Sequence, residues 1–268
     1  MTDDHLKWHL LKEMSEILIK KLSITKDITP LSHFLMSGKE PSVAVRIFLS
    51  DVYIGESDSD RNTALPIQEY EECQKFTIRC NDTFYDIQPV YFQKLVLLLA
   101  QSVCVSTSRF HLECPNLENI ALDMVDWAVD EIIQMVSNYV IPTVTSLEIV
   151  ADAQCCTPID FSELAPIPNI FPNIEKVSLQ VEPFCGHESN ELTLAAYKQM
   201  CEDFENFDPP FIFDFTYAPD NGFEHHEGLE VLLSSMELQK NVKNKLFWQF
   251  YKFRKSYPKK TLTIQYDE

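Results

Sequence analysis

The sequence contains only five glycines among its 268 residues. Backbone turns with positive φ favour glycine, so this scarcity counts against a β-propeller and against a glycine-rich nucleotide-binding fold. The phosphate loop Gly-x-x-x-x-Gly-Lys, the dinucleotide pattern Gly-x-Gly-x-x-Gly and the nucleophile turn Gly-x-Ser-x-Gly are also absent. We therefore expect a protein that is not an enzyme and binds no cofactor. A catalytic group assembled only in the folded chain is the remaining enzymatic alternative.

Long apolar runs and an export signal are missing as well. The longest apolar run, Leu95–Ala100, is far shorter than the roughly 20 residues that a membrane span needs. The segment Met1–His5 is acidic and polar, which predicts no signal peptide. We therefore expect a soluble intracellular protein, cytoplasmic or nuclear, whose eight cysteines are reduced.

The cysteines and histidines lack the spacing of a metal site. Zinc ligands usually occur as Cys-x-x-Cys or His-x-x-x-His, because two ligands must reach one ion from a turn or a helix face. The nearest clusters here are Cys155, Cys156, Cys185, His187, His225 and His226. Their spacing favours buried thiols and surface histidines, so no metal is expected.

Basic residues are the minority, with 22 Lys and Arg against 41 Asp and Glu and a formal net charge of -19. This balance counts against direct binding of nucleic acid or of an anionic membrane surface. Lys240–Lys260 is the exception, because its bases alternate with Phe, Trp and Tyr. One interpretation is an amphipathic helix over Val242–Phe253. The alternative is a regulatory scaffold that uses this basic aromatic stretch to reach RNA- or nucleic-acid-associated partners.

A repeated pattern dominates what is present. Pro115–Met124, Pro142–Ala151 and Pro172–Val181 each begin with proline and carry apolar residues two, five and seven positions later. The intervals of 27 and 30 residues between these prolines resemble the period of leucine-rich repeats. Strand side chains alternate between two faces, so stacked parallel copies could bury what one strand cannot. Chance alternation within an ordinary α/β domain is the alternative.

The segments around the repeats complete the expected fold. Helices are predicted over Trp127–Tyr139 and Asn190–Phe204, and further strands over Phe211–Tyr217 and Thr261–Tyr266. This alternation predicts an α/β fold, an irregular leucine-rich-repeat-like array of parallel strands and helices. It is irregular because the positions that usually carry the turn-bonding Asn or Cys hold Val125, Asp152 and Glu182.

Residues 1–41 are predicted to form a helical segment, and residues 42–268 the repeat-like domain. His5–Leu22 reads as an amphipathic helix, with a second short helix from Lys26 to Leu35. Leu6, Leu10, Met14, Ile17 and Leu18 fall at three- and four-residue spacings, and Leu11 and Leu22 extend this apolar stripe. Beyond it we expect strands over Val43–Ile54, Phe76–Cys80 and within Val103–Leu112, and a helix over Tyr91–Gln101.

Glu16–Phe34 combines an apolar helix, Leu-Ser, Lys-Asp and a second apolar helix, and Cys114–Val181 holds the repeats that begin with proline. The first segment is similar to the F-box pattern, and the second resembles the substrate-side repeats, of the nematode F-box-related proteins. The resemblance implies an adaptor in a ubiquitin ligase complex that binds a Skp1-like protein. The implied adaptor contacts are Ile17, Leu22, Ile24, Ile28 and Leu31. The alternative is that this segment only caps the repeat array.

If the strands stack, the residues between the buried positions line an open sheet face. Repeat proteins bind partners with such extended surfaces. The predicted partner-binding residues are Asn119, Asp123, Ser146, Glu148, Lys176, Ser178, Gln180 and Asp214. We therefore expect a non-enzymatic protein–protein interaction module, with its oligomeric state undefined by the sequence.

Overall fold

The computed structural model describes most of the chain in twelve stretches. These are residues 3–25, 27–49, 51–56, 74–80, 83–87, 100–106, 115–124, 127–154, 159–184, 190–218, 233–240 and 250–267. The chain consists of two compact units, with the boundary between Ile120 and Ala121, and each is described by itself. Within the described stretches, no helix is long and apolar enough to cross a membrane.

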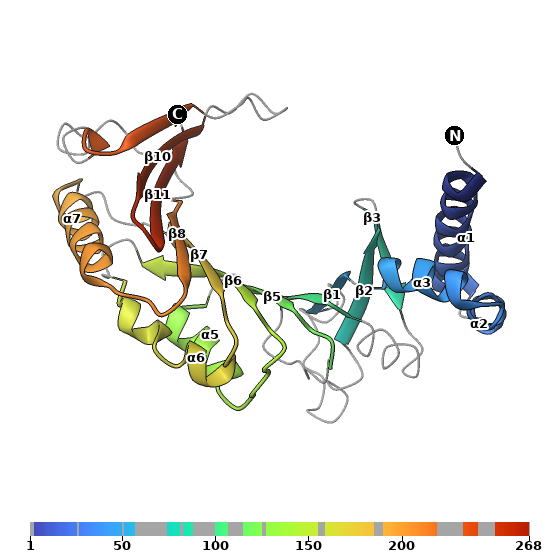
Figure 1. Ribbon diagram of the computed structural model, residues 1–268. Coiled ribbons are helices and arrows are strands. Elements are labelled where there is room, and N and C mark those ends of the chain that lie inside the picture. Colours follow the sequence, from blue (N-terminus) through green and yellow to red (C-terminus); the bar gives the residue numbers. More distant parts are fainter. Residues whose placement is uncertain are drawn as a thin grey trace, which may run out of the picture. The chain divides into compact units, whose positions relative to one another are not determined.

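Three helices open the first unit (Figure 1). They are α1 (Asp3–Thr25), α2 (Thr29–Met36) and α3 (Lys39–Phe48). The Asp27 carboxylate accepts a hydrogen bond from the Thr29 backbone N–H at 3.0 Å, which satisfies one of the free donors at the start of α2. The boundary predicted after residue 41 falls inside α3. The two predicted helices of the N-terminal segment are confirmed.

The apolar stripe predicted for α1 is only partly buried. Leu10, Met14 and Ile17 are 52%, 44% and 58% exposed, whereas Leu22 is buried and Leu11 and Leu18 are half-buried. Ile19, which lies outside the predicted stripe, is also buried. Ser15 is also buried, and its hydroxyl donates to the Leu11 carbonyl oxygen at 2.8 Å within the helix. The helix has apolar residues on two sides, and the predicted stripe combined residues from both.

The strand predicted over Val43–Ile54 is only half correct. Its first part lies in α3, and the strand β1 begins at Asp51. Pro41 stands in the first helical turn, where a missing N–H costs nothing. Ala44 and Val45 face the core while Val43 and Ile47 remain exposed, so this β-branched segment follows a helical period.

Four strands belong to the first unit in the order β3-β2-β1-β4. They are β1 (Asp51–Glu56), β2 (Gln74–Cys80), β3 (Thr83–Ile87) and β4 (Ser102–Val105). β1 pairs antiparallel with β2 and parallel with β4. The buried side chains of Val52 and Val103 face each other across the parallel pair. The predicted strand over Phe76–Cys80 is confirmed.

The second unit contains the strand order β5-β6-β7-β8-β11-β10-β9, although β5 starts just before the boundary. The strands are β5 (Asn119–Met124), β6 (Ser146–Gln154), β7 (Lys176–Phe184), β8 (Ile212–Tyr217), β9 (Glu237–Lys240), β10 (Phe250–Ser256) and β11 (Lys260–Asp267). The pairs β6–β7, β7–β8 and β8–β11 are parallel, whereas β10 pairs antiparallel with both β11 and β9.

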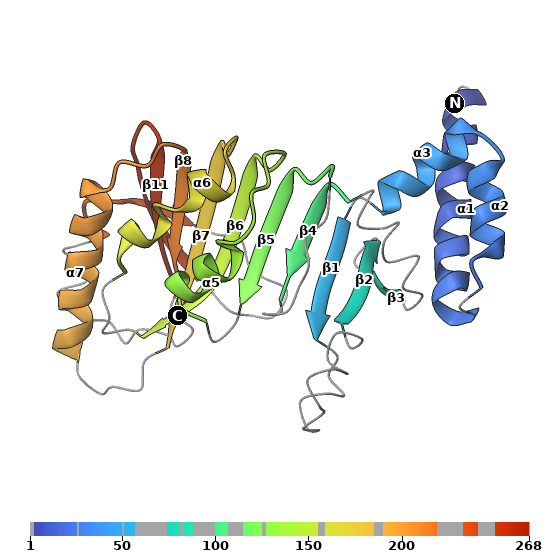
Figure 2. The same cartoon turned by 90° about the horizontal axis from the view of Figure 1, so that it is seen from below.

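The connections between these strands carry the helices. They are α5 (Val129–Val136), the 3-10 helix η2 (Phe161–Leu164), α6 (Ile167–Ile170) and α7 (Asn190–Asn206). Figures 1 and 2 show α5, α6 and α7 on the same side of the strands β6, β7 and β8. The α/β class, the two predicted helices and the strands over Phe211–Tyr217 and Thr261–Tyr266 are confirmed.

The core of the second unit consists of apolar rows that run across the sheet. Ile149, Leu179 and Phe215 are register partners on consecutive strands, and all three are buried. Leu262 extends the row on β11. The apolar residues predicted at these repeat positions, Leu117, Ile120, Leu122, Val144, Leu147, Ile149, Val177 and Leu179, are all buried, while Ile174 is half-buried. Alternation along each strand therefore predicted the inner face correctly.

A backbone hydrogen bond recurs where one strand passes to the next. The Gln101 carbonyl accepts from the N–H groups of Glu118 and Asn119 at 2.8 and 2.9 Å. The Thr145 carbonyl accepts from Glu175 and Lys176 at 2.9 and 3.0 Å in the same way. This repeated geometry makes Gln101 and Thr145 equivalent, so β4 occupies a position like those of the three segments recognised by their prolines.

The helix predicted over Val242–Phe253 is wrong at its end, because Phe250–Ser256 is the strand β10. The cross-strand partners of β10 lie on both β9 and β11. Several predictions fall outside the described residues. They concern residues 57–62, 91–99, 107–112, 229–232 and 242–249, and the cysteines and histidines at positions 155, 156, 185, 187, 225 and 226.

A candidate partner-binding surface on the open sheet face

The described helices of the second unit lie on one face of its sheet and leave the other face uncovered (Figures 1 and 2). The residues that alternate with the buried rows of β6, β7 and β8 point to this side. We call this surface the open face, defined by Ser146, Glu148, Val150, Lys176, Ser178, Gln180, Asp214 and Thr216. All eight are half-buried or exposed, and only Val150 among them is apolar. The exposed side chain of Ile212, the register partner of Lys176, lies on the same face.

The register places the open-face residues in rows. Glu148 faces Ser178, and Ser178 faces Asp214 on the next strand. Neighbouring strands lie about 4.8 Å apart, so each row is a regular ladder of polar groups. A rigid, regularly spaced polar surface can recognise a partner without first ordering a loop.

Charged side chains on the open face are partly paired with one another. The Lys176 ammonium lies 2.8 Å from a carboxylate oxygen of Asp214, and both side chains remain well exposed. The Gln180 side-chain amide donates to the Glu182 carboxylate at 2.6 Å. Because the Lys176–Asp214 pair is exposed, it contributes little to stability and can exchange for contacts with a partner.

The structure brings six of the eight predicted partner-binding residues together. Ser146, Glu148, Lys176, Ser178, Gln180 and Asp214 occupy adjacent strands of the open face. Asp123 follows the same alternation on β5, whose burial alternates from Asn119 onward. The amide of Asn119 belongs to the first unit and donates to the Ser102 hydroxyl at 3.1 Å.

The prediction missed the extension of this surface onto β11 and β10. Thr261 faces Asp214 and Thr263 faces Thr216 across the β8–β11 pair. Arg254 in turn faces Thr263, and by the same alternation Lys252 shares its side of the sheet. Alternation in Thr261–Tyr266 could have indicated the β11 part, but the helix predicted over Val242–Phe253 hid the contribution of β10.

The five predicted adaptor contacts separate into two groups. Leu22 and Leu31 are only 3% and 1% exposed and belong to the core of the helical region. Ile17 and Ile24 are 58% and 71% exposed on α1, and Ile28 is half-buried. Only Ile17, Ile24 and Ile28 are therefore available to a partner without unfolding.

An aromatic cluster fixes α7 against the inner face of the sheet. The Phe204 ring stacks at 5.9 Å on both Phe213 and Phe215, and Phe161 meets Phe215 edge to face at 5.0 Å. Such pairs add to the gain from burying large apolar surfaces. The cluster holds the strands that carry the open face, so it supports the surface without reaching it.

Polar groups close this cluster at the C-terminal end of α7. The Lys260 ammonium donates to the backbone carbonyls of Phe204, Glu205 and Phe207, which lie at the negative end of the helix. Burial lowers the pKa of Lys260. Lys255 and Tyr257 donate to the Glu205 carboxylate, and these two hydrogen bonds hold the pKa of Glu205 below its usual value.

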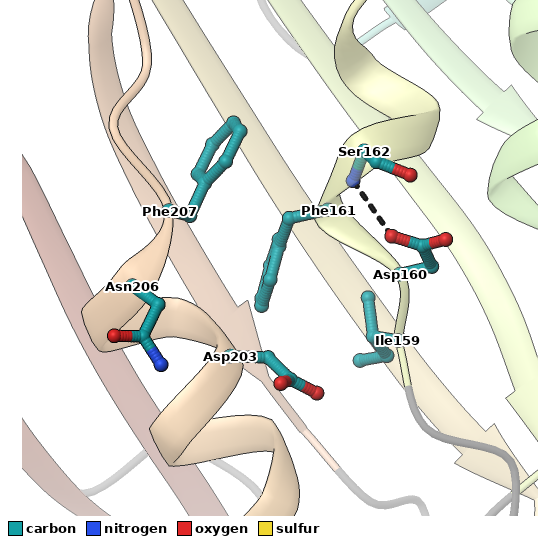
Figure 3. A pocket seen from close by; sticks show the side chains of 7 residues that line it. All are labelled: Ile159, Asp160, Phe161, Ser162, Asp203, Asn206 and Phe207. Atoms are coloured by element: carbon teal, nitrogen blue, oxygen red, sulfur yellow. Dashed lines mark hydrogen bonds between the residues drawn. The ribbon is translucent and has the colours of Figure 1, made fainter.

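A cleft of about 590 Å³ lies between η2 and the end of α7 (Figure 3). Ile159, Phe161 and Phe207 supply its apolar lining, and the Phe161 and Phe207 rings stack at 5.5 Å. The polar lining residues are Asp160, Ser162, Asp203 and Asn206. Asp160 already accepts from the Ser162 backbone N–H at 2.9 Å, and this bonding lowers the pKa of Asp160. Its carboxylate therefore acts as a helix cap.

Two further observations bear on chemistry. Burial raises the pKa of the Cys201 thiol to about 11, so little nucleophilic thiolate forms there at neutral pH. Among the described residues, no group of three or more His, Cys, Asp or Glu side chains could hold a metal ion.

No protein-family model, curated protein or solved structure matches this chain.

Proposed function

We propose that the protein is a non-enzymatic interaction module that binds a protein partner across its open face. The observation that carries this proposal is the uncovered, in-register polar surface on β6, β7 and β8, opposite a helix-covered and fully apolar inner face. A binding surface made of loops loses conformational entropy when the loops become ordered on binding. The open face consists of paired strands, so this cost is smaller. An intracellular location, cytoplasmic or nuclear, belongs to the proposal.

The leucine-rich-repeat-like description is part of the same proposal. Support comes from consecutive strands that lie side by side in chain order, with their connecting helices on one side. The recurring hydrogen bonds to the carbonyls of Gln101 and Thr145 also fit a repeated unit. The Asn173 amide donates to the Pro142 carbonyl at 2.8 Å, which joins equivalent ends of two successive segments. Arrays of this kind use their exposed strands for binding.

A partner-capture experiment tests the open face. Glu148→Lys and Ser178→Arg change charge or bulk at its centre, and Glu202→Lys changes an exposed residue of α7 as a matched control. We expect both open-face variants to lose the same proteins in quantitative mass spectrometry, and the control to keep them. With the purified partner, affinity should fall at least tenfold, or about 1.4 kcal/mol. Equal recovery in all three variants would contradict the proposal.

The adaptor role forms a second candidate, favoured by the exposed apolar side chains at Ile17 and Ile24 on a separate helical segment. In this F-box-like version the helices bind a Skp1-like adaptor of a ubiquitin ligase complex, while the open face binds the substrate. The direct test is capture of a purified Skp1-like protein by wild type and by Ile24→Glu. Unchanged capture after deletion of residues 1–41 would exclude the adaptor role and leave the open-face proposal standing.

The alternative of nucleic-acid-associated partners has less support among the described residues. Phe253 is the register partner of Ile264, which faces the buried side of the sheet, and Tyr257 bonds Glu205. These rings are therefore engaged with the protein rather than presented for base stacking. We favour a protein partner for this reason.

A further inference from the structure

Four of the large apolar side chains that the described residues expose lie on one stripe of α1. Leu10, Met14 and Ile17 follow spacings of four and three residues, and Ile24 follows seven residues later. Lys21 fills the position between Ile17 and Ile24, so the full series has the alternating four-three spacing of a coiled-coil seam. The buried residues Ser15, Ile19 and Leu22 lie on the other side of the helix. The stripe is therefore additional to the internal core.

The side chains beside this stripe favour a second copy of α1 as the binding partner. On one flank lie Glu13 and Lys20, both exposed, and on the other lie Leu11 and Leu18, both half-buried. If two copies of α1 pack antiparallel with Met14 opposite Ile17, Glu13 of each copy lies beside Lys20 of the other. The same register brings Leu11 beside Leu18. Both flanks are thus complementary to themselves, with opposite charges on one side and apolar contacts on the other.

A parallel arrangement lacks this complementarity. Equivalent residues then face each other, so Lys21 meets Lys21 of the second copy within the seam. Glu13 would lie beside Leu18, and Lys20 beside Thr25, and the charged flank would have no opposite partner. In the antiparallel register Lys21 meets Leu10 instead, where its methylene stem can cover the leucine while the ammonium reaches water.

We propose that the protein self-associates through an antiparallel pairing of two α1 helices, with Met14 and Ile17 at its centre. The contact covers only about two heptads, so we expect a weak, reversible dimer with a dissociation constant in the micromolar range. This interface occupies Ile17 and restricts any other partner of the helical region to Ile24 and its surroundings. It does not depend on the function proposed for the open face.

Sedimentation velocity of the full chain across a concentration series provides the first test. Wild type should convert from monomer to dimer as its concentration rises. Ile17→Glu should raise the dissociation constant at least about 30-fold, because it places a charge in the apolar centre. Val140→Glu is the matched control, since Val140 is 70% exposed and lies outside the open face, and it should dimerise as wild type does. A wild type that stays monomeric, or a dimer that Ile17→Glu leaves intact, would overturn the proposal.

Charge exchange tests the antiparallel register. Glu13 also pairs with His9 at 3.2 Å within α1, so circular dichroism should first show that each variant keeps its helix content. Glu13→Lys alone and Lys20→Glu alone should each weaken self-association several-fold by placing like charges side by side. The double variant should restore it, and a mixture of the two single variants should form mixed dimers in preference to either homodimer. Failure of both the double variant and the mixture to recover association would exclude this register.

The same variants distinguish a second copy of the protein from a Skp1-like adaptor as the partner of the α1 stripe. If wild type stays monomeric while Ile17→Glu abolishes capture of a purified Skp1-like protein, the stripe is an adaptor site and the self-association proposal is wrong. If wild type dimerises and the charge exchange recovers association, the second copy is the occupant.

Discussion

α1 and α5 both carry apolar residues at helical spacing, yet they use them in opposite ways. The four residues Val129, Ile132, Ile133 and Val136, which recur at helical spacing in α5, are all buried. In α1 the predicted residues Leu10, Met14 and Ile17 are exposed, and of the two buried residues Ile19 and Leu22 only Leu22 belonged to the predicted stripe. A helix with one apolar face has one way to pack, whereas a helix with two needs its neighbours to choose between them.

The same contrast separates the surfaces of the two units. The second unit keeps apolar rows on its inner face and polar residues on its open face, with only isolated exceptions such as Ile212. The described helices of the first unit expose seven large apolar side chains: Leu10, Met14, Ile17, Ile24, Met36, Val43 and Ile47. Clustered exposed apolar residues often mark interaction sites, so this contrast fits the proposal of apolar contacts on the helices and polar contacts on the sheet.

The largest effect is expected from Phe213→Ala, in the aromatic cluster of the second unit. Phe213 is fully buried and contacts the rings of Phe204, Phe211 and Phe215. Its removal leaves a cavity, and we expect the free energy of unfolding to fall by about 3–5 kcal/mol. Urea denaturation followed by near-UV circular dichroism measures this loss. Ile212→Ala, on the opposite face, should change it by less than about 0.5 kcal/mol; similar losses in both would remove the distinction between the faces.

Two alanine substitutions test directly which side of α1 is buried. Ile19→Ala removes a buried side chain and should lower the free energy of unfolding by about 2–4 kcal/mol. Ile17→Ala, two positions earlier on the exposed stripe, should change it by less than about 0.5 kcal/mol at concentrations where the protein is monomeric. Far-UV circular dichroism during thermal unfolding reports both. A larger loss of unfolding free energy for Ile17→Ala than for Ile19→Ala would mean that the side of α1 carrying Ile17 is the buried one.

Lys260→Met tests the polar closure of the aromatic cluster. The substitution keeps much of the side-chain volume but leaves the Phe204, Glu205 and Phe207 carbonyls without this donor. We expect a loss of about 1–3 kcal/mol in the free energy of unfolding. Lys259→Met, at the exposed neighbouring position, supplies the control. Hydrogen exchange should also show faster opening of the last turn of α7 in the Lys260 variant alone.

The smallest predicted effect is a pH dependence at Glu205. Its folded-state pKa is lowered by hydrogen bonds from Lys255 and Tyr257, so its stabilising contribution is present above the unfolded pKa and is lost as pH falls through the folded pKa. The raised pKa of Lys255 makes its contribution disappear only at alkaline pH. Glu205→Gln should therefore flatten the acid limb of the melting-temperature profile. An unchanged acid limb would show that these bonds do not contribute measurably.

Sequence patterns predicted the structure correctly in the repeated strands, where only one face of each strand is apolar enough to be buried. In Leu147, Ile149 and Ala151 the period of two selects one face, and a shift by one residue would expose all three. The predicted strand over Val43–Ile54 failed at Val43–Phe48 because β-branched residues weighed more than the helical spacing of Ala44 and Val45. The helix predicted over Val242–Phe253 failed at its end because Phe250 and Phe253 are three residues apart, which is a helical spacing, whereas pairing with β9 and β11 makes Phe250–Ser256 a strand.

The candidate site shows the same division. Alternation alone placed Ser146, Glu148, Lys176, Ser178 and Gln180 on one side of the sheet, since side chains of a strand alternate whatever its neighbours are. Alternation cannot say that β11 lies beside β8, which brings Thr261 to Asp214. Likewise, the Lys260 contacts with the end of α7 join residues more than 50 positions apart.

By itself the sequence determined the α/β class, the inner rows of the repeated strands and the polar character of the face opposite them. Those features follow from local periodicity, which acts through neighbouring residues of one chain segment. Tertiary structure alone decided which side of α1 is buried, how far the open face extends and that the C-terminal segment forms β10. Each of these depends on burial against, or hydrogen bonding to, segments distant in sequence, which local spacing does not encode.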